Sequence, residues 1–198
     1  MNLGIATRVT LIDCLREKQD SGWTRFVQLY GPYVKHWALR VGTPFQDCDD
    51  VCQDVYRVVV DRIEGFELGE RTGSFRKWIQ QITRNVCYEH SRRHGPSSGQ
   101  GGTQALIELQ GIASIESCED DSPDIVVDLY RRAVELAKPE FSQRDWSIVE
   151  SLVQGSLTTN EIAAQFGLSA AAVRQIKSRI FRRIRAELGD IPAEPSPS

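Results

Sequence analysis

At 198 residues the chain can form one medium-sized domain or two small ones, and its 40% hydrophobic content is sufficient for folded cores. The net charge of −3 excludes a uniformly basic nucleic-acid-binding protein, and no apolar run is long enough to span a bilayer. The N-terminus also lacks a signal-peptide pattern, so we expect a cytoplasmic protein.

Charge is segregated along the chain. Residues 47–70 contain eight acidic side chains and two arginines, whereas residues 71–94 contain six basic side chains and one glutamate. Residues 95–125 contain six acidic side chains and neither lysine nor arginine. Because local patches decide where a polyanion binds, nucleic-acid binding is compatible with the negative net charge.

The first part of the chain predicts three helices. A short helix lies in residues 1–20, and a second begins after Ser21, with Gly31–Pro32 interrupting or restarting it because proline fits a first turn but not a helix interior. Asp47 can cap a third helix, which buries valines and presents a polar ridge on its outer side. The ridge consists of Asp50, Gln53, Asp54, Arg57, Asp61 and Glu64.

A fourth helix is predicted from Ser74 to His94, after a polar loop that contains two glycines. Its outer faces interleave basic and aromatic side chains, a combination that suits single-stranded nucleic acid, because cations track phosphates and rings stack on bases. The alternative is that Phe75 and Trp78 simply belong to the core, as their helical spacing indicates. This helix alone leaves both interpretations open.

Two residue pairs have the spacing of metal ligands. Cys48 and Cys52 lie one helical turn apart, as do His90 and His94. The five cysteines are odd in number and scattered, so no disulfide framework is implied. We expect reduced thiols and ordinary surface histidines, with no metal and no cofactor.

A stretch rich in glycine and serine, residues 95–103, has the composition of a flexible linker. The acidic segment after it could form a short helix around residues 106–112. Helical periodicity resumes at Ile125 and again after Ser142, and no strand pattern occurs. The expected fold is therefore all-α, with two small helical domains joined by a flexible linker.

The stretch from Thr158 to Leu188 predicts two helices with a tight turn between them. Thr158 and Glu161 have capping-box spacing, Gly167 suits a turn that needs positive φ, and Ser169 can cap the second helix. Basic side chains crowd the surface of that second helix, which is the pattern of a helix-turn-helix whose second helix enters the major groove of DNA. The alternative is a merely structural helix pair with a solvated basic face.

Three motifs occur in a fixed order across the linker. They are DCDDVCQDVYRVV (residues 47–59), GSFRKWIQQITRNVCYEHSRR (residues 73–93) and VQGSLTTNEIAAQFGLSAAAVRQIKSRIFRRIRAEL (residues 153–188). With these motifs the chain resembles the bacterial RNA polymerase sigma factors of the small, extracytoplasmic-function type. The resemblance covers nearly all of residues 20–188 except the linker.

The resemblance implies a division into domains. Residues 1–95 would form a region-two-like domain for core polymerase binding and minus-ten recognition, and residues 96–124 a flexible acidic linker. Residues 125–190 would form a region-four-like helix-turn-helix domain for minus-thirty-five recognition, and residues 191–198 a disordered tail.

Three groups of site residues follow from the resemblance. Core polymerase would be bound by Asp49, Asp50, Gln53, Asp54 and Arg57. Minus-ten DNA would be bound by Arg76, Lys77, Trp78, Arg84, Asn85, Tyr88, Arg92 and Arg93. Minus-thirty-five DNA would be bound by Ser169, Ala170, Ala171, Arg174, Gln175, Lys177, Ser178, Arg179 and Arg182.

Within the last group, Arg174 is expected to reach base edges, whereas Arg182 and the neighbouring Arg183 should meet only the DNA backbone. The implied partners are core RNA polymerase, through its largest and second-largest subunits, and promoter DNA. An anti-sigma factor is left open, since the sequence names none.

Other classes of function remain as alternatives. An ordinary helix-turn-helix regulator would explain residues 158–188 but not the acidic ridge together with the basic, aromatic helix. A module that only sequesters a regulator would bind no DNA. No metal-ligand cluster, phosphate-binding glycine loop or nucleophile elbow supports an enzyme.

Overall fold

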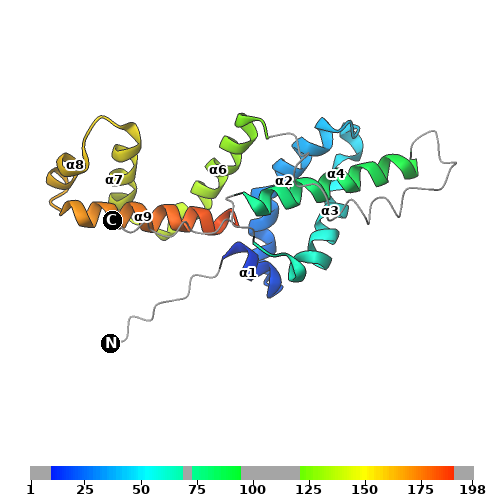
Figure 1. Ribbon diagram of the computed structural model, residues 1–198, viewed down its shortest axis with the longest axis horizontal. Helices are drawn as coiled ribbons and strands as arrows, with labels where there is room; N and C mark the ends of the chain where they lie inside the picture. Colours follow the sequence, from blue (N-terminus) through cyan, green and yellow to red (C-terminus); the bar gives the residue numbers. More distant parts are fainter. Residues whose placement is uncertain (1–9, 69–72, 95–120, 190–198) are drawn as a thin grey trace.

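The computed structural model describes residues 10–68, 73–94 and 121–189, and within these ranges the regular elements are all helical (Figure 1). The prediction of an all-α fold is confirmed. The α-helices are α1 (Leu11–Arg16), α2 (Asp20–Arg40), α3 (Cys48–Arg62), α4 (Ser74–His94), α6 (Pro123–Ala137), α7 (Gln143–Gln154), α8 (Thr159–Gln165) and α9 (Ala170–Glu187). Short 3₁₀ helices are η1 (Phe45–Asp47), η2 (Ile63–Gly65) and η4 (Lys138–Glu140). The predicted short helix at 106–112 and the predicted linker and tail lie largely outside the described residues.

Helices α1 to α4 form one group, built around α2. The predicted interruption at Gly31–Pro32 is wrong, because α2 runs unbroken through Pro32. An interior proline removes a backbone hydrogen bond and costs about 3 kcal/mol in an isolated helix. Here Tyr30 and Tyr33, on either side of the proline, are both fully buried, and this packing outweighs the lost bond.

Aromatic side chains hold this first group together. The ring of Phe26 stacks on that of Tyr30 at a centroid distance of 5.5 Å, and Phe75 of α4 meets Tyr30 edge to face at 5.3 Å. Edge-to-face and offset-stacked rings add specific geometry to the burial of their area. Helix α4 is thereby fixed on α2, and its N-terminal half lies over the aromatic cluster.

Helices α6 to α9 form the second group, and the predicted signals at its turns are confirmed. Thr158 and Glu161 make a capping box: the Thr158 N–H donates to the Glu161 carboxylate at 2.7 Å, and the Thr158 hydroxyl accepts from the Glu161 N–H at 3.3 Å. Gly167 has φ +62° in the turn before α9, and the Ser169 hydroxyl accepts from the Ala172 N–H at 3.1 Å. Ile162, Ala163 and Val173 are buried between α8 and α9, so the pair has the packing of a helix-turn-helix.

The two groups touch each other (Figure 1). Helix α6 packs against α2, and the last residues of α9 reach the first group. Leu188, after α9, and Ile12, in α1, belong to one continuous cluster of buried side chains. The sequence analysis did not predict this contact.

Candidate nucleic-acid interface

Helix α9 presents one polar, basic face and one packing face. Val173 and Ile180 are fully buried and fix the helix on its neighbours. The predicted minus-thirty-five residues lie on the other side. Ala170 is half-buried, and the exposed members are Ser169, Ala171, Arg174, Gln175, Lys177, Ser178, Arg179 and Arg182. One turn of small residues followed by long basic ones can enter a groove about 12 Å wide.

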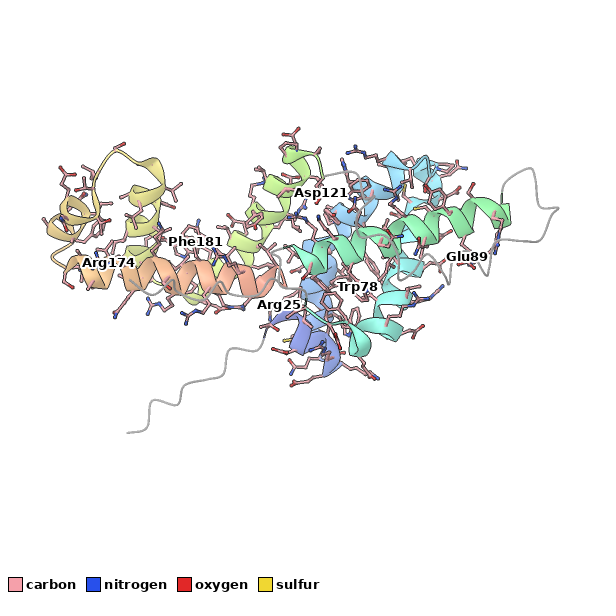
Figure 2. All side chains as sticks on the ribbon, viewed as in Figure 1. Arg25, Trp78, Glu89, Asp121, Arg174 and Phe181 are labelled. Carbon is pink, nitrogen blue, oxygen red and sulfur yellow. The ribbon has the colours of Figure 1, made fainter. Side chains whose placement is uncertain are left out.

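The arginines on this face differ in how firmly they are held. Arg174 lies near the N-terminal end of α9 (Figure 2), and within the described residues neither it nor Arg182 is ion-paired. Arg179 pairs with Asp145 of α7 at 2.6 Å, and its guanidinium lies 5.6 Å from the ring of Phe141. The side chains of Arg174 and Arg182 are therefore available to a ligand, whereas Arg179 has a competing partner.

The expectation for Arg183 is wrong. Its side chain is buried, and it does not lie on the basic face with Arg182. Its Nε donates to the Glu140 carboxylate at 2.7 Å, and its guanidinium also pairs with Glu187 one turn later in α9. Removing a guanidinium from water is costly unless the charge is paired. Here two carboxylates supply that pairing. Arg183 is a structural residue.

Helix α4 carries the predicted minus-ten residues, with unequal exposure. Tyr88 is 56% exposed, and Arg92 and Arg93 are exposed near the helix end. Lys77, Trp78, Arg84 and Asn85 are half-buried. Figure 2 shows Trp78 toward the start of the helix and Glu89, which pairs with Arg93 at 2.6 Å, toward its end.

Trp78 belongs partly to the core. Its ring lies 4.8 Å from that of Phe66 and 5.7 Å from that of Phe75, and Phe75 is fully buried. Phe75 is therefore a core residue, as its helical spacing indicated. Trp78 packs against the same rings but remains partly exposed.

Arg76 is tied to the segment before α6. Its Nε lies 2.7 Å from the Asp121 carboxylate, and the Arg76 side chain is only 18% exposed. Asp121 also accepts hydrogen bonds from the Tyr33 hydroxyl at 2.7 Å and the Trp37 indole N–H at 3.0 Å. Burial, and then the hydrogen bond to Asp121, raises the pKa of Tyr33 well above its ordinary value, so the phenol stays protonated and donates.

The acidic ridge lies on α3, away from the valines that face the core. Asp49, Asp50, Gln53 and Arg57 are exposed, and Asp54 is half-buried. Arg57 pairs with Asp54 at 2.7 Å. Lys35 of α2 pairs with Asp49 at 3.1 Å. The ridge is a solvated, largely acidic surface. In each of its two ion pairs one side chain is exposed: Arg57 in the pair with Asp54, and Asp49 in the pair with Lys35.

The cysteines within the described residues are buried thiols. Cys48, Cys52 and Cys87 are buried, and burial raises the pKa of the Cys52 thiol to about 11. Among the described residues no group of three or more histidine, cysteine, aspartate or glutamate side chains could hold a metal ion. None of the helices described is both long and apolar enough to cross a membrane.

Comparisons with known proteins match both helical groups. Residues 26–96 match the family model described as Sigma-70 region 2, and residues 140–186 match that described as Sigma-70, region 4. The two matches together cover more than half of the chain. A curated relative, "Probable RNA polymerase sigma factor RfaY" of Xanthomonas campestris pv. campestris, is 28% identical over 155 residues. That alignment covers 76% of this chain and 36% of the relative, so the chain spans about a third of that relative's length.

Two solved structures are also similar. "Structure of CnrH in complex with the cytosolic domain of CnrY" matches with a TM-score of 0.35 and 19% identity, covering 90% of this chain and 95% of that one. The sigma factor RpoE in complex with the anti-sigma factor NepR from Bartonella quintana matches with a TM-score of 0.31 and 16% identity, covering 84% and 96%.

Sequence reasoning missed the residues that join the two groups. Arg25 and Glu187 form an ion pair across 162 positions, and Asp121 inserts between α2 and α4. Neither feature can be predicted from nearby residues, because hydrophobic periodicity and capping patterns depend only on residues within a few helical turns. In the sequence, an arginine on an amphipathic helix and an aspartate in an acidic run look like ordinary surface residues.

Proposed function

The chain belongs to the sigma-70 family of RNA polymerase sigma factors, and from this premise we propose that it binds core RNA polymerase and directs promoter recognition, DNA melting and transcription initiation. The observation that carries the proposal is the exposed basic face of α9, held on a helix-turn-helix in the same chain as the acidic ridge of α3. A duplex-binding regulator needs only the first of these surfaces.

Minus-thirty-five recognition is assigned to α9. The free N–H groups at its N-terminus favour a phosphate, and Ser169 and Ala171 leave room for the groove wall. Arg174, one residue past the buried Val173, is exposed. A guanidinium in that position can pair with the acceptors of a guanine.

Minus-ten binding is assigned to α4 and the loop before it. The exposed Tyr88 offers a ring for stacking, and Arg92 offers a cation for the backbone of an opened strand. Holding unstacked bases on such a surface offsets part of the cost of melting. The protein itself would do no covalent chemistry; it would supply sequence selectivity to the polymerase.

Docking on core polymerase is assigned to the α3 ridge. Its carboxylates face solvent, with the buried valines of α3 on the opposite side. Charged surfaces of this kind speed the encounter with a partner of opposite charge and set how the two proteins align. The expected partner surface is basic and helical, on the largest subunit.

The remaining assignments follow from these roles. We assign residues 1–95 to core and minus-ten binding, 96–124 to a linker, 125–190 to minus-thirty-five binding and 191–198 to a tail. The protein would be of the small, extracytoplasmic-function type and would act in the cytoplasm, where the polymerase is. Whether an anti-sigma factor is a further partner is left open, since the sequence names none.

Gel filtration of the purified chain with core polymerase, with and without promoter duplex, tests this function against its main alternative. The proposal predicts a stable complex with core and sequence-selective capture of duplex by that complex. An ordinary helix-turn-helix regulator would bind duplex without core and would elute separately from the polymerase, which would overturn the proposal.

A further inference from the structure

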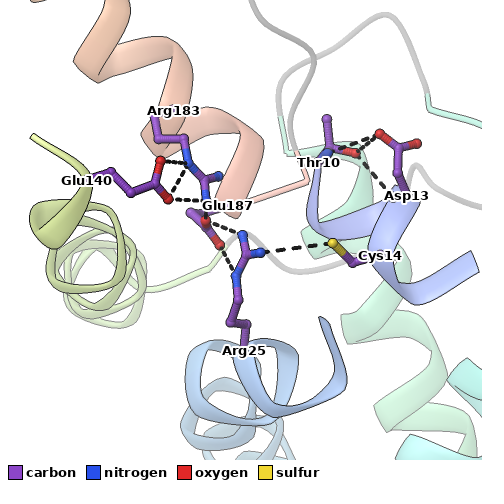
Figure 3. A network of polar contacts seen from close by, with 7 residues as sticks. All are labelled: Thr10, Asp13, Cys14, Arg25, Glu140, Arg183 and Glu187. Carbon is purple, nitrogen blue, oxygen red and sulfur yellow. Dashed lines mark hydrogen bonds and ion pairs between the residues drawn. The ribbon is translucent and has the colours of Figure 1, made fainter. Parts of the chain in front are cut away.

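Two arginines of α9 pair with carboxylates of η4 and of the first turn of α7. Arg183 donates through Nε to the Glu140 carboxylate at 2.7 Å (Figure 3), and one turn earlier in α9 the Arg179 guanidinium lies 2.6 Å from the Asp145 carboxylate. The two pairs differ in burial, because the Arg183 side chain is 8% exposed and the Arg179 side chain is 48% exposed. Arg183 therefore belongs to the packing of α9, whereas Arg179 remains accessible to a ligand.

The position of α9 does not depend on the Arg179 pair. Val173 and Ile180 are fully buried, and the buried Arg183 holds the second half of the helix. An ion pair with an exposed arginine adds little to stability, because water competes for both charges. Replacing Asp145 should therefore leave the helix-turn-helix folded and in place.

The Arg179 guanidinium is held from two sides. Asp145 is fixed in the first turn of α7, where its backbone N–H donates to the Ser142 hydroxyl at 3.1 Å. On the other side, the guanidinium lies 5.6 Å from the ring of Phe141, which meets the buried ring of Trp146 edge to face at 6.1 Å. Because an aromatic ring attracts a nearby cation, the carboxylate and the ring together stabilise one position of this side chain.

A DNA phosphate would have to compete with Asp145 for Arg179. Arg174 and Arg182, on the same exposed face, form no ion pair within the described residues and can meet DNA directly. Each cation that binds a phosphate adds affinity for any sequence and steepens the salt dependence. Arg179 can add its share only by leaving a carboxylate that lies 2.6 Å away.

We propose that Asp145 limits sequence-independent DNA binding by the helix-turn-helix, because it holds the Arg179 guanidinium that a DNA phosphate would otherwise bind. Base contacts then carry a larger share of the affinity, so Asp145 sets how strongly the domain binds non-promoter DNA. This inference rests on the proposed function, since it takes α9 as the DNA-binding helix. It also changes the role of Arg179 from a DNA contact to a cation withheld from DNA.

Fluorescence anisotropy of the full chain with a duplex of randomised sequence tests this role. The variant D145N removes the charge of the carboxylate and keeps its size. The control D128N makes the same change in α6, where Asp128 lies 2.6 Å from Arg131. Because a partly exposed ion pair limits the gain, D145N should bind roughly fivefold tighter than the wild type at about 50 mM salt and less than about twofold tighter at about 200 mM. D128N should match the wild type.

The same substitution in an R179A background separates competition for Arg179 from a general loss of negative charge. Comparing D145N/R179A with R179A closes a double-mutant cycle, which measures the coupling between the two side chains. Most of the gain from D145N should disappear in this background. Equal gains in the two backgrounds, or equal gains for D145N and D128N, would overturn the proposal.

A purely structural role of Asp145 predicts a change of opposite sign. Weaker duplex binding by D145N, with unchanged helical circular dichroism, would mean that the pair positions α9, and it would overturn the proposal. If D145N loses helical signal, D145Q decides by the same criteria, because glutamine suits the third position after a serine cap. Wild-type binding with no gain for D145N would overturn this proposal alone. No duplex binding by any variant or by the wild type would also contradict the DNA-binding part of the proposed function.

Discussion

Arg25 in α2 and Glu187 at the end of α9 form an ion pair between residues 162 positions apart, and the carboxylate is almost completely buried. Arg25 lies one residue before the region 2 match, and Glu187 lies one residue after the region 4 match. Because Arg183 shares the carboxylate, the network stabilises α9 internally as well as across the contact. The contribution of this network to the free energy of unfolding can be measured by comparison with an exposed ion pair.

Arg183→Ala should lower the free energy of unfolding by about 3–5 kcal/mol, since it leaves buried Glu187 with one partner fewer. The matched control is Arg131→Ala, which removes an arginine that is 70% exposed and paired with Asp128 within one helix turn. That change should cost about 0–1 kcal/mol. Urea titration of both variants checks the difference, and equal losses would mean that the Arg183 network adds no more than a surface pair.

Polymerase docking should depend on the α3 ridge. Asp54→Arg together with Gln53→Ala should weaken core binding by several kcal/mol, roughly, through like-charge contact with a basic partner surface. The control is Asp20→Arg with Gln19→Ala, which makes the same changes at exposed positions at the start of α2. Competition for core polymerase checks the result. Equal binding by the two double variants would remove the ridge from the docking surface.

Promoter melting should depend on α4. Lys77→Ala with Asn85→Ala should impair open-complex formation more than closed-complex binding, because both half-buried side chains lie on the helix assigned to the opened strand. Permanganate footprinting of the minus-ten thymines is the measurement. Thymines that react equally with mutant and wild-type holoenzyme would show that another element does the melting.

Promoter selection should distinguish two arginines on α9. Arg174→Ala should cost roughly 1–3 kcal/mol and relax preference at particular minus-thirty-five positions, since this side chain is placed to reach base edges. Arg182→Ala should weaken binding to all sequences and reduce the salt dependence by about one unit of slope. Selection from a randomised duplex pool at several salt concentrations separates the two. An unchanged selected sequence for Arg174→Ala would make that residue a phosphate contact.

The Cys52 thiol should be unreactive in the native protein. With a pKa raised to about 11 by burial, it is about one-thousandth ionised at pH 8, and the thiolate is the reactive form. Raising the pH toward 11 should increase the thiolate and the rate of alkylation. Peptide mass spectrometry after iodoacetamide treatment checks this, with the urea-unfolded chain as the fast reference. Equal rates at pH 8 in the two states would contradict the burial of this side chain.

The sequence predicted local structure well where the deciding contacts are a few residues apart. The capping box of Thr158 and Glu161, the positive φ of Gly167 and the cap at Ser169 all depend on neighbours within one turn. The exposed face of α9 followed from periodicity in the same way, apart from Arg183. That arginine lies next to Arg182 in sequence, but its position is decided by Glu140, which is 43 residues away.

Tertiary packing decided the features that the sequence could not predict. Pro32 stays within α2 because the aromatic side chains around it are buried on both sides, which helix propensity does not register. The contact between the two helical groups depends on Asp121 and Glu187, and each pairs with side chains far away in the sequence. The assignments of individual side chains to DNA and to polymerase stay predictions.

Transcription in vitro with purified core polymerase, this chain and a randomised promoter library tests the central claim most directly. The account predicts transcripts that depend on the added chain and start downstream of a shared pair of elements about 25 base pairs apart, roughly 85 Å along the duplex. Arg174→Ala should change the upstream element of the selected promoters and leave the downstream element as it is. Absence of chain-dependent transcripts, with core polymerase active on a control sigma factor, would contradict the account.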